Sequence, residues 1–109
     1  MKNEQTDLIC GLNTAQREAL KAKHHVIFLV TVKDGEEEFN AICTEPTLEV
    51  MQSTKAIGAT DEVKGSLVIY DNCVLEADAA IKNRFTLKSQ VIKSITEKMA
   101  SISVTTKNL

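Results

Sequence analysis

The sequence predicts an α+β fold: an N-terminal helix, one antiparallel β-hairpin, and then three α-helices packed around a small aliphatic core. A β-branched run at Val26–Val32 is followed by the turn dipeptide Asp34-Gly35, which is typical of a hairpin. Apolar residues recur at helical spacing through the second half of the chain. With one Pro and four Gly, the chain has too few turn formers for an all-β barrel.

The first helix and the hairpin follow from local signals. Asn13 or Thr14 is expected to cap a helix over Ala15–Lys23, where every residue favours helix. The strand Val26–Val32 is expected to turn at residues 33–36 and to return over residues 37–44. A two-stranded hairpin is marginal alone, so it must pack on the helices or gain a third strand from another chain.

Three further helices are expected in the second half. The first runs over residues 47–57 and stops at Gly58, and the second begins after a Thr60 cap and ends near Leu75. A polar connection over residues 76–85, with one helical turn at 79–82, leads to a last helix capped by Thr86. The apolar stripe of that helix comprises Leu87, Val91, Ile92, Ile95, Met99 and Ile102.

The 109 residues suit a single domain. We expect a flexible N-terminal segment over residues 1–12, a single α+β domain over residues 13–103 and a C-terminal tail over residues 104–109. Only four aromatic residues contribute to the core, so aliphatic packing must supply most of its stability. Self-association into a homo-oligomer would supplement so thin a core.

Charge and hydropathy exclude several partners. The net charge is −2 and the chain contains only Arg17 and Arg84 as arginines, which argues against a nucleic-acid partner. The longest apolar run is of strand length, so no membrane span is expected. Residues 1–7 lack the apolar core of a signal peptide, and a cytoplasmic location is therefore expected.

No group of residues predicts catalysis, a metal site or a cofactor site. Cys10, Cys43 and Cys73 are widely spaced and suit small buried positions better than a nucleophile. His24 and His25 are adjacent and would point to opposite faces of a strand. The acidic run at residues 34–38 suits a solvated hairpin tip, and the chain has no glycine-rich phosphate loop. We therefore do not expect an enzyme.

Binding to another protein is the remaining function. The amphipathic last helix and the hairpin offer apolar surfaces that a partner helix or strand can use. The candidate partner-binding residues are Phe39, Ile42, Ile92, Ile95, Met99 and Ile102. The alternative is that the stripe of the last helix simply closes the core.

The order of short motifs resembles the small tail assembly chaperone-like proteins of tailed phages and prophages. The motifs are the helix at residues 15–21, Glu45-Pro46-Thr47, Gly58-Ala59-Thr60-Asp61, Asp71-Asn72-Cys73-Val74 and a final Lys107-Asn108-Leu109. The likeness spans residue 12 to the last residue. Val74 stands where this family commonly has an aromatic residue, and Ala77 stands where it commonly has Gly.

The resemblance implies a role without catalytic residues. Such proteins bind the long, aggregation-prone tape-measure protein in the host cytoplasm while tail-tube subunits assemble around it. Two alternatives stay open. One is a minor virion structural or head–tail completion protein, which would remain in the particle. The other is a small enzyme or regulator that depends on Cys or His.

Overall fold

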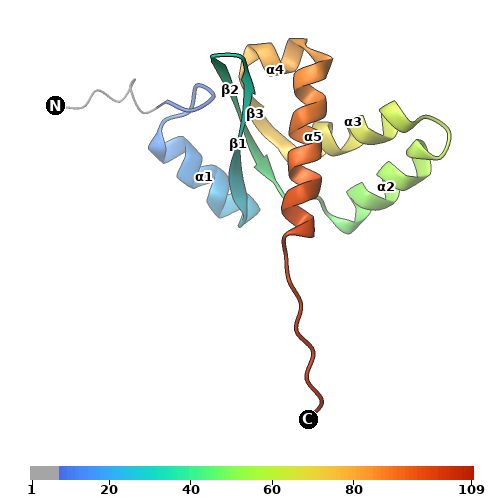
Figure 1. Ribbon diagram of the computed structural model, residues 1–109. Helices are drawn as coiled ribbons and strands as arrows, with labels where there is room; N and C mark the ends of the chain where they lie inside the picture. The colour runs from blue at the N-terminus through green and yellow to red at the C-terminus, as the bar shows by residue number, and fades with distance from the viewer. Residues whose placement is uncertain (1–7) are drawn as a thin grey trace.

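The computed structural model describes residues 8–109 and has an α+β fold (Figure 1). A three-stranded antiparallel sheet in the order β1-β2-β3 lies between helices. The elements are α1 (Thr14–His24), β1 (Ile27–Asp34), β2 (Glu37–Thr44), α2 (Leu48–Gly58), α3 (Glu62–Cys73), β3 (Val74–Ala77), α4 (Ala79–Asn83) and α5 (Phe85–Ala100).

Helix α1 begins at the cap that its sequence predicts. The Asn13 side chain accepts a hydrogen bond from the Gln16 amide at 2.9 Å, and the Gln16 side chain accepts one from the Asn13 amide at 2.8 Å. This reciprocal capping box satisfies two amides that the helix itself cannot pair. Just before it, the Ile9 and Leu12 main chains pair, at 3.0 and 2.9 Å. Residues 1–7 of the expected flexible segment lie outside the described residues.

The hairpin turns one residue later than the Asp34-Gly35 dipeptide predicts. Asp34 still belongs to β1 and pairs with Glu37, so Gly35 and Glu36 form the two-residue loop. Gly35 has a φ of 64°, the left-handed region that glycine adopts readily, and this places the turn at Gly35-Glu36. Phe28, Val30 and Val32 of β1 face the core, opposite Cys43, Ala41 and Phe39 of β2. The other sheet face carries Leu29 opposite Ile42.

The sheet has a third strand where the sequence pattern predicts helix. The pattern predicts that the second of the three helices ends near Leu75, but α3 ends at Cys73 and β3 begins at Val74. The Asn40 amide donates to the Asp78 carboxylate at 2.6 Å, and the Asp78 amide donates to the Asn40 carbonyl at 2.9 Å. The hairpin thus gains its third strand from its own chain, through contacts between residues far apart in sequence.

The helix boundaries near the end of the chain also differ from the expectation. The predicted helical turn is α4, so four helices follow the hairpin where three were predicted. Helix α5 begins at Phe85, with Arg84 at its cap and no side-chain cap bond, so the predicted Thr86 cap is wrong. The Arg84 carbonyl accepts hydrogen bonds from the Leu87 and Lys88 amides, both at 3.1 Å, which starts the helix earlier.

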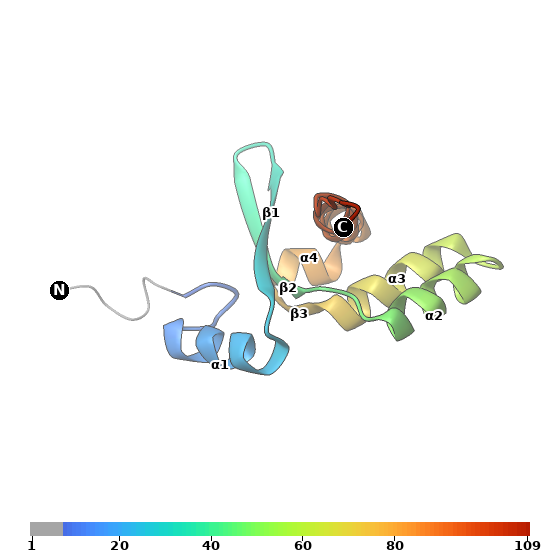
Figure 2. The same cartoon turned by 90° about the horizontal axis from the view of Figure 1, so that it is seen from below.

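The core lies between the sheet and the helices α3, α4 and α5. Helix α1 lies on the other side of the sheet, and α2 and α3 form a helical hairpin that extends sideways from it (Figures 1 and 2). The core is aliphatic, as expected from the composition. Its buried residues are Val30, Val32, Ala41, Cys43, Ile69, Tyr70, Cys73, Ala77, Ile81, Leu87, Val91, Ile92 and Ile95.

Candidate functional site

Three of the six candidate partner-binding residues are buried in the fold. Ile92 and Ile95 belong to the core between α5 and the sheet, and Ile95 is 1% exposed. Ile42 is buried on the α1 side of the sheet. A partner cannot reach these side chains in the folded protein, so they stabilise the domain itself.

The other three candidates are at least partly accessible. Phe39 and Met99 are half-buried, and Phe39 packs against the core from β2. Ile102 lies beyond the end of α5 and is 65% exposed. Because half of the six side chains are buried, the structure does not join them into one exposed surface.

Exposed apolar side chains also lie on the hairpin of α2 and α3, which we call the arm. The two helices pack closely against each other, and α2 contributes no fully buried residue. Leu48 at the start of α2 is 73% exposed, and Val63 in the first turn of α3 is 52% exposed. Apolar residues at these positions gain nothing from the core, so they are available to a partner.

A shallow groove joins the arm to α5. It has a volume of about 180 Å³ and lies between the first half of α3 and the first half of α5. Val63 and Phe85 provide its exposed apolar surface above the buried Ile92, and Glu62, Ser66 and Ser89 provide its polar rim. This mixture of apolar floor and polar rim is suited to an amphipathic helix of a partner.

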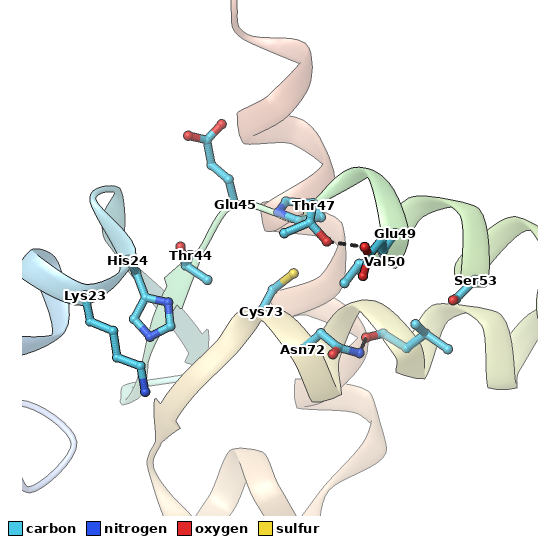
Figure 3. Close-up of a pocket in the computed structure, with 12 residues that line it drawn as sticks. Lys23, His24, Thr44, Glu45, Thr47, Glu49, Val50, Ser53, Asn72 and Cys73 are labelled. Atoms are coloured by element: carbon cyan, nitrogen blue, oxygen red, sulfur yellow. Dashed lines mark hydrogen bonds between the residues drawn. The ribbon is translucent and has the colours of Figure 1, made fainter.

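A larger hollow of about 540 Å³ lies where the arm joins the rest of the fold (Figure 3). Lys23 and His24 line it from the end of α1, Glu45 lines it from the segment between β2 and α2, and Glu49 lines it from the first turn of α2. The Thr47 hydroxyl caps α2 by accepting from the Val50 amide at 3.2 Å. The hollow is open, and its positively and negatively charged side chains are spread along its wall. It therefore lacks the convergent polar groups of a small-molecule site.

The three cysteines are not arranged as nucleophiles. All three are free thiols, and Cys43 and Cys73 are buried. Burial raises the pKa of the Cys43 thiol to about 12, and burial together with the Asp78 carboxylate raises the pKa of Cys10 to about 11. Burial also raises the pKa of Cys73. Since the thiolate is the reactive form, these thiols are inert near neutral pH.

We expect native protein at pH 8 to react much more slowly with a thiol reagent such as dithionitrobenzoate than protein unfolded in guanidinium. Unfolding exposes the thiols and returns their pKa values toward 9.0. Because the pKa values of Cys10 and Cys43 are higher in the folded protein than in the unfolded chain, the free energy of unfolding depends on pH. The contribution of these thiols to that free energy is fully present below pH 9 and is lost as the pH rises toward 11 to 12. Native thiols that react as fast as unfolded ones would contradict this expectation.

His25 and the acidic turn take part in local contacts that hold the fold together. The His25 amide donates to the Lys21 carbonyl at 2.7 Å and ends α1. At the hairpin tip, the Arg84 guanidinium lies 2.9 Å from the Asp34 carboxylate, and Lys33 lies 3.5 Å from Glu38. Within residues 8–109, no three His, Cys, Asp or Glu side chains are grouped so that they could hold a metal ion.

Over the same residues, no helix combines the length and hydropathy needed to cross a membrane. Comparison of the chain with family models, with curated proteins and with solved structures found no match.

The candidate site therefore rests on the exposed apolar residues of the arm and the groove beside it. Sequence periodicity did not identify Leu48 and Val63 because apolar residues at helical spacing are as typical of a core as of an interface. Phe85 was missed because the sequence pattern places it in the polar connection, whereas it is the first residue of α5.

Proposed function

We propose that this chain is a protein-binding module of the phage tail assembly chaperone kind, with the tape-measure protein as its partner during tail assembly. The observation that carries the binding role is the arm, whose apolar residues Leu48 and Val63 are exposed although the core beside them is closed. The identity of the partner is proposed from the motif resemblance. One of the motifs that carry this resemblance, Gly58-Ala59-Thr60-Asp61, lies in the arm.

An amphipathic helix is the partner chemistry that best fits the arm. The groove between α3 and α5 offers Val63 and Phe85 for an apolar stripe, and its hydroxyl and carboxylate rim suits polar flanks. Tape-measure proteins are long and helical, so their unassembled segments expose such stripes. A small protein that covers a stripe keeps it from aggregating until tube subunits replace it.

Co-expression with a phage tape-measure protein tests the proposal. We expect the wild-type chain to raise the amount of tape-measure protein in the supernatant and to co-purify with it. Val63→Asp places a charge in the groove and should abolish both effects. Ala19→Asp, at an exposed position of α1 and away from the arm and the groove, is the matched control and should behave like wild type.

Two outcomes would contradict the proposal. The chaperone role is wrong if the wild-type chain neither forms a complex with the tape-measure protein nor raises the amount of that protein in the supernatant. Mass spectrometry of purified particles provides the second check, because a chaperone leaves before the tail is complete. Abundant incorporation of this chain would favour the alternative of a minor virion or head–tail completion protein.

A further inference from the structure

The outer edge of β1 is an unpaired strand edge. In the order β1-β2-β3, β1 pairs only with β2, and no other strand of residues 8–109 lies on its far side. Alternate residues of such a strand direct their N–H and C=O groups away from the sheet. An unpaired edge of eight residues is a template for another strand.

This edge lacks the residues that usually prevent strand pairing. Exposed edges commonly carry lysine or proline along their length, or a bulge. The only charged residues of β1 are Lys33 and Asp34 at its end, and its pairing with β2 runs without a bulge from Ile27 to Asp34. Leu29, near its middle, is 50% exposed on the sheet face beside α1.

Charges of opposite sign lie at the two ends of β1. The turn that follows it carries Glu36 beside Asp34, which is already paired with Arg84, whereas the last turn of α1, just before it, carries Lys21 and Lys23. An antiparallel partner strand with the same charges would bring each acidic end beside a basic end. The acidic turn would then favour one antiparallel arrangement instead of opposing every edge contact.

We propose that β1 pairs with β1 of a second copy of this chain, antiparallel and about a two-fold axis. The identical strand is self-complementary in this orientation, and the pair closes without leading to a filament. A register centred on Thr31 sets Leu29 of one copy opposite the methylene groups of Lys33 of the other. The same register brings Glu36 beside the end of α1 in the second copy, near His25 and Lys23.

The proposal does not rest on the proposed chaperone function, because the β1 edge and the arm are different surfaces. Sedimentation velocity of the purified full chain at increasing protein concentration tests it. We expect a reversible monomer–dimer equilibrium in the wild-type protein. Thr31→Lys places two lysines next to each other at the axis, where like charges oppose pairing, and should raise the dimer dissociation constant about tenfold or more.

Matched variants separate edge pairing from misfolding and from other contacts. Gln52→Lys adds the same charge on α2 and should leave the dimer unchanged, and circular dichroism should show the native fold for both variants. Lys23→Glu should weaken the dimer, and Lys23→Glu combined with Glu36→Lys should restore it, because the charge pair is then reversed.

Two results would overturn the proposal. The first is a monomer at every concentration tested, and the second is a dimer that Thr31→Lys leaves intact. In the second case, the exposed β-branched segment Ile102–Thr106 is another possible source of the pairing strand. If deletion of residues 102–109 abolishes a dimer that Thr31→Lys does not affect, that segment is the contact and β1 self-pairing is wrong.

Discussion

Replacing Gly65 with alanine should destabilise the arm strongly. A Cβ at Gly65 would lie 2.6 Å from the Gly58 Cα and 2.8 Å from the Thr54 carbonyl oxygen. Both neighbours are main-chain atoms of α2, so α2 must move away for the methyl group to fit. We expect a loss of about 1–3 kcal/mol in the free energy of unfolding, although alanine favours helix over glycine.

Gly58→Ala is the control for this prediction because it tests the same contact from the other side. A Cβ at Gly58 would lie 3.8 Å from the Gly65 Cα, which is an ordinary van der Waals distance. We expect little change or a gain of up to about 1 kcal/mol, since Gly58 is helical. Urea denaturation of the two variants measures the difference, and equal losses in both would show that the close approach is not at Gly65.

Ile95→Ala should be the most destabilising of the substitutions in the predicted partner-binding set. The Ile95 side chain is 1% exposed and belongs to the core between α5 and the sheet. Truncation to alanine leaves a cavity that the surrounding side chains fill only in part. We expect a loss of about 2–5 kcal/mol in the free energy of unfolding, measured by urea denaturation.

Ile102→Ala provides the comparison, because it changes the same residue type on the same sequence stripe. Ile102 is 65% exposed beyond the end of α5, so its truncation should change the free energy of unfolding by less than about 0.5 kcal/mol. If Ile102→Ala were as costly as Ile95→Ala, the segment after α5 would be packed against the domain. The pair thus separates core residues from surface residues within one stripe.

Local signals predicted much of the fold correctly. The α+β class is confirmed, and the predicted hairpin forms, with its loop at Gly35-Glu36, one residue later than expected. Asn13 caps α1, and Gly58 is the last residue of α2. Each of these features depends on residues within a few positions of one another, and the chemistry of caps and turns acts over that range.

The third strand could not be predicted in this way. Val74 continues the helical spacing of Val63, Leu67 and Tyr70, so the periodicity favours helix where the chain forms β3. What decides the outcome is the pairing of β3 with β2, together with the bonds between Asn40 and Asp78. These residues are 38 positions apart, and sequence spacing carries no information about such a contact.

The candidate binding surface was missed for a related reason. A stripe of apolar residues predicts that one side of a helix is covered, but it does not say what covers it. For α5 the cover is the sheet of the same chain, which buries Ile92 and Ile95. For the arm, the same kind of pattern leaves Leu48 and Val63 exposed, and only the arrangement of the helices distinguishes the two cases.

The absence of fully buried residues in α2 has a consequence for the cooperativity of the domain. Helix α2 packs mainly against α3, whereas α3 passes directly into β3 and supplies Ile69, Tyr70 and Cys73 to the core. Hydrogen exchange should therefore show α2 opening as a separate unit while β2 and α5 remain protected. A partner that binds the arm would slow exchange in α2 first. Exchange in α2, the part of the protein that opens most readily, would therefore be a sensitive measure of binding to the arm.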